Sequence, residues 1–296
     1  MPMICGIIWS NDEESFETCP SGESMNVFAS IMRRAVRQRK KLGLALGGGA
    51  ARGFAHIGVI RALEEGYIVP SCVAGTSAGS LVGALYCAGF DSHRIEEEAR
   101  KMKWADLVQM TLPRMGLVKT DKLSDLVQEL IGDVRIDDLK LPFAAVTVDL
   151  VSGQERVIRS GPVHTAVRAS CGLPGVFVPV ERDGELLVDG GTRNSVPADV
   201  ARSLGADFVV GVDLNADNVG SDEGIDNVVD VLARTMGILM YATSDVGRRN
   251  SDIFLQPDLV GFSYHSMGRI DEAIERGYAA MKAIVPRLRQ ICEIHS

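Results

Sequence analysis

Two short apolar runs in the first third of the chain each end in glycines and pass directly into a helical pattern. The first run is Leu42–Leu46, and helical spacing follows over Phe54–Glu65. The second run is Ser71–Gly75, and the helical pattern resumes over Ala78–Ala88. Strands that alternate with helices across short connections are typical of an α/β domain with a largely parallel sheet. The sequence therefore predicts this fold class.

The same alternation continues through the rest of the chain. Further runs with strand character are Phe143–Asp149, Glu155–Ile158, Leu186–Val188, Phe208–Asp213 and Ile253–Leu255. Further helical patterns are Ser92–Lys103, Lys122–Ile131, Val163–Ala169, Ala198–Leu204, Val228–Asp245 and Ile270–Leu288. Because no internal repeat or low-complexity linker interrupts this order, we expect one domain over residues 41–290, with a helical insertion at about 91–138 that is a candidate cap over a site.

Residues 1–40 are predicted to form an N-terminal extension. From about Met25 to Lys40, apolar residues recur at helical spacing, and basic residues crowd the end of the segment. A basic amphipathic helix either packs on the domain or lies on an anionic membrane surface. No apolar run reaches the ~18 residues of a membrane span, and the first residues lack the features of a signal peptide. We therefore expect a cytoplasmic protein that is peripheral at the membrane through transient contact.

Composition excludes several function classes. The 296-residue chain carries 31 Lys and Arg against 39 Asp and Glu, a net charge of −8, which argues against nucleic-acid binding through overall charge. Its six cysteines show no CxxC or Cys/His spacing, so we expect no metal site and a reducing compartment. We also expect no cofactor. Nothing in the sequence indicates an oligomeric state.

Residues Gly47–Gly53 read Gly-Gly-Gly-Ala-Ala-Arg-Gly and connect the first predicted strand to the first predicted helix. Consecutive glycines expose backbone N–H groups, and beside a helix N-terminus these groups can hold an anion. Phe54 and Ala55 stand where a phosphate-binding P-loop has Lys and Ser or Thr, and the glycines do not match G-x-G-x-x-G. The loop therefore suits a tight structural turn or the oxyanion of an acyl transfer.

Residues Gly75–Gly79, Gly-Thr-Ser-Ala-Gly, match the G-x-S-x-G nucleophile elbow and lie between a predicted strand and helix, as that motif requires. The turn would expose the Ser77 hydroxyl and direct the N–H of Ala78 toward a substrate carbonyl. A serine hydroxyl needs a base to become a nucleophile. Asp189, at a predicted strand end, is one candidate; His265 is another, because the order Ser77, Asp189, His265 matches α/β-hydrolases. The remaining histidines are expected to pack, cap or face solvent: His56, His93, His164 and His295.

The glycine loop, the serine elbow and Asp189-Gly190-Gly191 occur in one order along the chain. Together with Ala169–Phe177 and Asn194–Pro197, they resemble the patatin-like phospholipase family, in particular its compact bacterial members. The resemblance covers about residues 41–215 and is less distinct to 290. It implies a three-layer patatin-like α/β fold, in which a central, mostly parallel sheet is flanked by helices.

The resemblance also implies a serine acyl hydrolase that cleaves carboxylic esters of lipids, phospholipid or lysophospholipid, through an acyl-serine intermediate. Ser77 would be the nucleophile and Asp189, 112 residues later, the base of a Ser–Asp dyad. The implied oxyanion-hole donors are Gly47, Gly48, Gly49 and Ala78. The implied supporting residues are Arg52, Gly75, Gly79, Gly190 and Gly191.

Three alternatives stay open at this point. They are a Ser-His-Asp esterase that uses His265, a lipid acyltransferase in which another alcohol replaces water, and a non-catalytic binding or regulatory module. The presence of Ser77, Asp189 and the glycines disfavours the last. Apolar residues of the insertion are candidates for lining an acyl-chain groove: Met102, Trp104, Leu107, Val108, Met110 and Leu112. The head group, acyl length and positional preference do not follow from the sequence.

Overall fold

The structure is a computed structural model that describes residues 40–102, 109–110, 118–119, 121–216, 228–262 and 267–292. These residues belong to one compact unit that begins at Lys40. The amphipathic helix predicted near the N-terminus lies outside the described residues, apart from Lys40. The division of the chain into an extension over 1–40 and a domain over 41–290 stays a prediction.

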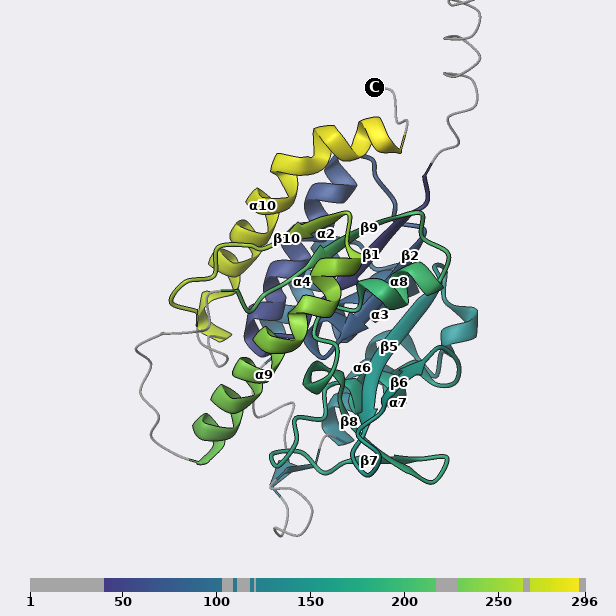
Figure 1. Cartoon of the computed structure of the whole chain (residues 1–296), viewed down its shortest axis with the longest axis vertical. Coiled ribbons are helices and arrows are strands. Elements are labelled where there is room, and N and C mark those ends of the chain that lie inside the picture. The colour runs from purple at the N-terminus through teal and green to yellow at the C-terminus, as the bar shows by residue number, and fades with distance from the viewer. Residues whose placement is uncertain are drawn as a thin grey trace, which may run out of the picture. The chain divides into compact units, whose positions relative to one another are not determined.

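A mixed sheet forms the centre of this unit (Figure 1). Its parallel strands, in spatial order, are β10 (Ile253–Leu255), β9 (Phe208–Val212), β1 (Leu42–Leu46), β2 (Cys72–Thr76) and β5 (Phe143–Asp149). The antiparallel strands are β6 (Glu155–Ile158), β7 (Val180–Arg182) and β8 (Glu185–Asp189). A separate antiparallel pair joins β3 (Gln109–Met110) to β4 (Val118–Lys119). The predicted mostly parallel sheet is confirmed.

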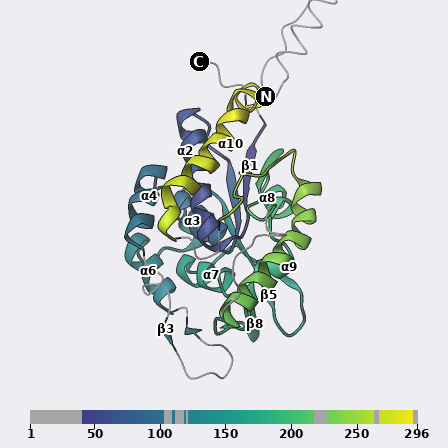
Figure 2. The same cartoon turned by 90° about the vertical axis from the view of Figure 1, so that its left-hand side faces the viewer.

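Helices cover both faces of the sheet (Figure 2). One layer contains α2 (Ala55–Glu65), α3 (Ala78–Ala88), α7 (Val163–Ser170) and α10 (Ile270–Ile291), with α4 (Ser92–Lys101) and α6 (Asp121–Ile131) packed outside it. The other layer contains α8 (Ala198–Ser203) and α9 (Val228–Asn250). Short 3-10 turns are η1 (Ala50–Phe54), η2 (Ile136–Asp138), η3 (Gly190–Thr192) and η4 (Met267–Arg269). Within the described ranges, none of these helices combines the length and the apolar character that a membrane span needs.

The sequence of β1 explains why two layers form. Side chains alternate between the faces of a strand, so the three leucines of β1 join the larger core, which includes residues of α2, α3, α7 and α10. Ala45 joins the second core, with residues of α8. A Cβ at Gly43 would lie 2.5 Å from the Cβ of Ala206, so only glycine permits this approach. The predicted three-layer α/β architecture is confirmed.

Strands β2 and β8 meet end to end along one edge of β5. The last pair between β2 and β5 is Thr76 with Val146, and the last pair between β8 and β5 is Asp189 with Thr147. Strand β6 pairs with both of these β5 residues on the opposite edge. Because β2 and β8 run in opposite directions and finish at adjacent β5 positions, the residue after β2 and the last residue of β8 are brought together.

Candidate active site

Ser77 occupies the turn between β2 and α3 in a strained conformation. Its φ is 54° and its ψ is −126°, and a positive φ is unfavourable for a residue with a Cβ. The Ser77 N–H donates to the hydroxyl of Ser170 at 2.9 Å, and that hydroxyl donates to the carbonyl of Val146 at 2.7 Å. Ser170 therefore ties the strained turn to β5.

The two glycines of the elbow stand where no side chain fits. A Cβ at Gly75 would lie 2.5 Å from the carbonyl oxygen of Gly79, and a Cβ at Gly79 would lie 2.1 Å from that of Leu46. The start of α3 is consequently pressed against the end of β1. This close approach is what brings Ser77 to the glycine loop that follows β1.

Asp189 ends β8 with its carboxylate beside Ser77. The carboxylate accepts a hydrogen bond from the N–H of Gly191 at 2.8 Å, and the Ser77 side chain lies close enough to lower the pKa of Asp189. Ser77 is 8% exposed and Asp189 is 2% exposed. Burial raises the pKa of Asp189 to about 6, although the Ser77 side chain and the Gly191 N–H act in the other direction. Asp189 is therefore a stronger base than an exposed carboxylate and lies within reach of the Ser77 proton.

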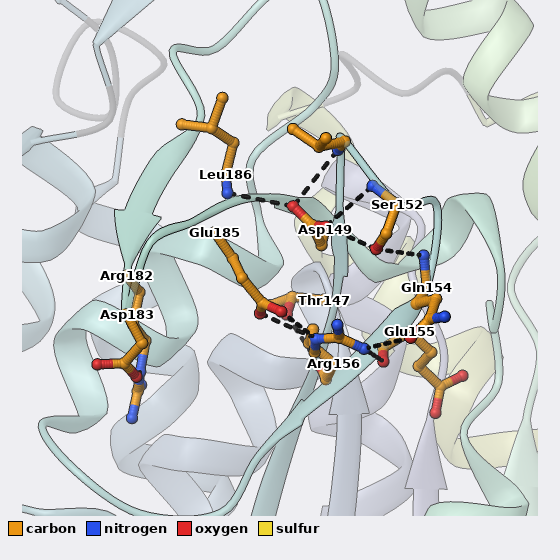
Figure 3. Close-up of polar contacts among 11 residues, drawn as sticks. Thr147, Asp149, Ser152, Gln154, Glu155, Arg156, Arg182, Asp183, Glu185 and Leu186 are labelled. Carbon is orange, nitrogen blue, oxygen red and sulfur yellow. Dashed lines mark hydrogen bonds and ion pairs between the residues drawn. The ribbon is translucent and has the colours of Figure 1, made fainter.

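A polar network fixes the strand that carries this aspartate (Figure 3). The carboxylate of Asp149, at the end of β5, accepts hydrogen bonds from the Leu186 N–H at 3.2 Å and the Ser152 hydroxyl at 2.6 Å. Hydrogen bonds, first of all from Ser152, lower the pKa of Asp149 to about 2. Arg156 of β6 pairs with Glu185 at the start of β8, with 2.7 Å between Nε and Oε1. The register of β8 on β5 is thus held at its start.

The glycine loop lies directly against the elbow, since a Cβ at Gly48 would be 3.2 Å from the Cβ of Ser77. The Gly47 N–H donates to a β9 carbonyl at 3.0 Å, and the Gly48 N–H donates to the Ser195 carbonyl at 3.1 Å. In the described part of the chain, the N–H groups of Gly49 and Ala78 have no hydrogen-bond partner. Of the four predicted oxyanion donors, Gly47 and Gly48 already donate to backbone carbonyls, and the role of these groups in binding an oxyanion stays a prediction.

Two side chains hold the carbonyl groups of this loop. Nε2 of His56 lies 2.8 Å from the carbonyl oxygen of Gly47. Since a carbonyl oxygen can only accept a hydrogen bond, Nε2 carries the proton and donates it. Burial lowers the pKa of His56 to about 4, with the bond to Gly47 opposing it, so the imidazole is neutral near pH 7. The amide of Asn215 donates to the Gly48 carbonyl at 2.9 Å. The loop is thus fixed from α2 on one side and from the end of β9 on the other.

Arg52, predicted to support the loop, is buried and acts at longer range. Its Nε donates to the carbonyl of Phe262 at 2.8 Å, and its Nη1 donates to the carbonyl of Leu214 at 3.2 Å. These carbonyls belong to the segments after β10 and β9. Because a buried guanidinium needs its hydrogen bonds satisfied, Arg52 fastens η1 to both segments and so fixes the far end of the glycine loop.

Helix α9 covers the site on the other side of the sheet. The methyl group of Met240 is 2.9 Å from the position of a Gly48 Cβ and 2.5 Å from that of a Gly191 Cβ. The Thr243 hydroxyl donates to the Gly191 carbonyl at 2.7 Å. A Cβ at Gly190 would lie 2.4 Å from a β5 carbonyl. The two glycines after Asp189 therefore allow close packing against β5 and α9.

Several sequence-based predictions concern residues outside this cluster. His265 lies outside the described residues, as do His295 and most of the proposed acyl-groove residues; Met102 packs half-buried against the core. His93 is solvated as predicted, with its side chain 82% exposed. His164 interacts with Ser124 at 2.7 Å. Among the described side chains, no three His, Cys, Asp or Glu residues gather as a metal site.

Sequence reasoning assigned no role to Ser170 or Asn215, and it placed His56 only as a core or capping residue. For Asn215 a signal existed, since it follows β9, the parallel neighbour of β1, and the carboxyl ends of parallel strands share one edge of a sheet. For Ser170 and His56, the contacts depend on tertiary packing that no local pattern encodes.

The fold, together with Ser77 and Asp189, defines an α/β protein in which a serine at a strand–helix elbow lies beside an aspartate at a strand end. The patatin-like phospholipase profile matches residues 44–202, which is more than half of the chain and includes the glycine loop, Ser77 and Asp189. The chain belongs to the patatin-like phospholipase family, and at the level of the family a lipid esterase activity is implied.

Curated relatives extend this result. An uncharacterized NTE family protein of Mycobacterium tuberculosis is 40% identical over 190 residues, which cover 61% of this chain and 51% of that protein. Human patatin-like phospholipase domain-containing protein 6 is 30% identical over 277 residues, 82% of this chain and 20% of that protein. Neuropathy target esterase of Drosophila melanogaster is 36% identical over 193 residues, 62% and 13% respectively. The chain thus spans about half the length of the mycobacterial relative and less of the animal ones.

Among solved structures, VipD from Legionella pneumophila superposes with a TM-score of 0.50 over 84% of this chain and 67% of that chain. The sequence identity is 15%, so the likeness concerns the fold alone. It agrees with the three-layer architecture described above.

Proposed function

We propose that this chain is a serine acyl hydrolase that cleaves carboxylic esters of lipids, with phospholipid or lysophospholipid as substrate. The observation that supports the proposal most is that β2 and β8 end at adjacent residues of β5, so that Ser77 lies beside the buried Asp189. Family membership supports the lipid class of the substrate. In this proposal Ser77 is the nucleophile, Asp189 is the base, and no imidazole takes part.

The reaction proceeds in two halves. Ser77 Oγ attacks the ester carbonyl carbon while Asp189 takes the hydroxyl proton, and the carbonyl electron pair moves to oxygen. The N–H groups of Gly49 and Ala78 donate to this oxyanion; one such donor is typically worth about 3–4 kcal/mol. Collapse expels the alcohol, which takes the proton from Asp189. Water then attacks acyl-Ser77 with Asp189 as base, releasing the fatty acid and restoring the hydroxyl.

The environment of Asp189 suits this role. A general base works best when its pKa lies near the working pH, and burial brings the pKa of Asp189 to about 6. At neutral pH the carboxylate is then ionised and still basic enough to assist Ser77.

We further place the activity in the cytoplasm, peripheral at the membrane, with a lipid ester as partner and no nucleic acid. The free cysteines Cys72, Cys87, Cys171 and Cys292 support a reducing compartment.

Covalent labelling tests the nucleophile. A long-chain fluorophosphonate should give one adduct, on the peptide that contains Ser77, and Ser77→Ala should abolish both the adduct and esterase activity. Asp189→Asn should lose activity as well and label far more slowly. Lipid cleavage by a preparation in which Ser77 stays unlabelled would contradict the proposal.

His265→Ala is the matched control for the base, because it removes the imidazole of the alternative triad. We expect this variant to keep most of its labelling and activity. If it is folded by circular dichroism and as inactive as Ser77→Ala, a Ser-His-Asp triad replaces the dyad. Product analysis with added acceptor alcohols separates the acyltransferase alternative, which would yield new esters in place of free fatty acid.

A further inference from the structure

Helix α9 exposes large apolar side chains on the side that faces away from the sheet. Their exposed fractions lie between 37% and 60%. We call the following residues the outer face of α9: Val228, Val231, Ile238, Leu239, Tyr241 and Val246. Figures 1 and 2 show α9 on the outside of the described unit in both views. This side of the helix is therefore open in the described part of the chain.

Most of these side chains form one stripe. At 100° per residue, Val231, Ile238, Leu239 and Val246 fall within roughly 100° of the helix circumference, and Val228 to Val246 spans about 27 Å along the axis. Between these two ends, the other residues on the stripe are neutral or small, Thr235 and Ala242. A surface helix normally turns its polar side to water, and a contiguous exposed apolar patch marks an interaction surface.

The opposite side of the same helix is a wall of the candidate active site. Met240 packs against Gly48 and Gly191, and Thr243 is hydrogen-bonded to Gly191. The outer face therefore lies one helix diameter, about 10 Å, outside the glycine loop. Exposed apolar side chains also stand at Leu150 and Val151, directly after β5, at the edge of the sheet where Ser77 is held.

Polar groups border the stripe where a lipid head-group layer would begin. Tyr241 lies beside the stripe, and its ring carries a hydroxyl, which suits a boundary between hydrocarbon and water. Arg248 and Arg249 follow the last apolar residue with side chains 50% and 80% exposed, and each forms a loose ion pair with the exposed Asp245, at 4.0 and 3.7 Å. Arginines at the end of an apolar helix face can bind lipid phosphates while the apolar part enters the acyl boundary.

We propose that the outer face of α9 is the surface on which this chain docks to a phospholipid bilayer. The proposal rests on the proposed function, since the bilayer is where a lipid ester substrate is found. An uncharged apolar stripe matches hydrocarbon, and the net positive charge that Arg248 and Arg249 leave beside Asp245 at its end matches phosphate. Docked in this way, the protein holds its candidate active site one helix away from the lipid.

Vesicle flotation of the full chain tests this surface. The Ser77→Ala background is used throughout, so that hydrolysis cannot alter the vesicles. With phosphatidylcholine vesicles, we expect the double variant Ile238→Glu/Leu239→Glu to lower the partition coefficient at least tenfold. Val69→Glu is the matched control. Val69 is 69% exposed and precedes β2, so it lies at the amino-terminal end of this strand, opposite the end that leads to Ser77. This control should bind as the parent does.

Three results would overturn the docking surface. The first is equal flotation of the double variant and the control. The second is binding that requires phosphatidylglycerol and disappears with salt in every variant, which would assign it to the basic segment at 25–41. The third is a change in particle mass by light scattering with no change in flotation, which would make the outer face a contact between copies.

Hydrolysis of a soluble short-chain ester, measured on chains with Ser77 intact, separates the two proposals. The double variant should keep the parent rate on that ester and lose cleavage of vesicle lipid. If Ser77 fails to label while flotation still depends on Ile238 and Leu239, the proposed function fails and the docking surface stands. If Ser77 is labelled and the α9 substitutions do not change flotation, the proposed function stands and the docking surface fails.

Discussion

Replacing Asp189 by asparagine should make the protein more stable while removing its activity. The carboxylate is 2% exposed, and burial raises its pKa from 3.8 to about 6. A raised carboxyl pKa means that the folded state disfavours the charged form. Asparagine has no charge, and its side-chain oxygen can still accept the Gly191 N–H. The substitution therefore removes the cost of burying the charge and keeps the shape.

The size of this stability gain and its pH dependence both follow from the pKa values of Asp189 in the unfolded and the folded protein. Each pKa unit corresponds to about 1.4 kcal/mol, so a change from 3.8 to about 6 corresponds to about 3 kcal/mol. Protonated Asp189 costs the folded protein nothing, so the parent is most stable below the pKa that Asp189 has in the unfolded chain. The parent then loses stability as the pH rises through the pKa that Asp189 has in the folded protein. Asp189→Asn should accordingly exceed the parent by about 3 kcal/mol at pH 8 and by only about half of that at pH 5.

Urea unfolding followed by circular dichroism measures this difference directly. The parent and Asp189→Asn are compared at several pH values from 5 to 8, and Asp149→Asn serves as a control of opposite sign, because hydrogen bonds lower the pKa of that carboxyl to about 2. A stability gain for Asp189→Asn that does not shrink toward pH 5 would refute the assignment of the effect to a buried charge. A loss of stability at pH 8 would refute the reasoning altogether.

Further predictions concern the base, the turn and the glycine loop. Because Asp189 must be ionised to accept a proton, kcat/KM on a soluble ester should fall about tenfold per pH unit below pH 6, measured in a pH–rate profile. Since Ser77 has a positive φ, Ser77→Gly should be more stable than Ser77→Ala by about 1–2 kcal/mol in urea, with both inactive; equal stabilities would mean that the turn is relaxed. His56→Leu leaves a buried carbonyl without its donor, so it should lower kcat and destabilise by about 1–3 kcal/mol, whereas His56→Gln, which can still donate, should recover part of both. Gly79→Ala should prevent soluble expression, because its Cβ would meet a backbone oxygen at 2.1 Å. Gly268→Ala, with no atom of the described residues within 4 Å of the new Cβ, should fold normally.

The sequence predicted most of the sheet because its strands are apolar, short and bounded by turn residues. The bounds of β1, β5, β6 and β10 match the predicted ranges. Strand β7, Val180–Arg182, was missed, since three residues carry no usable periodicity and the strand depends on pairing with β8. Helix α9 was predicted to end at Asp245 but continues to Asn250. Gly247 does not end the helix; it allows α9 to pack closely against Val196.

The places of Ser77 and Asp189 in the fold could be predicted from local motifs, but the hydrogen bonds around them could not. Ser77 and Asp189 stand at a strand–helix turn and a strand end, and both positions leave a sequence signature. The use of each glycine amide depends on which carbonyl comes within reach after folding. Gly48 illustrates this, because its N–H is taken by Ser195, a residue 147 positions away whose approach no local pattern announces.

The end-to-end meeting of β2 and β8 on β5 has a consequence for how the protein can change. Ser77 and Asp189 are set by two registers on a single template strand. The chain that leaves at Ala88 and returns at Phe143 contributes to neither register. That excursion can therefore be lengthened, shortened or exchanged without moving the two groups apart. It is the place where a change of substrate preference would leave the position of Ser77 relative to Asp189 unaltered.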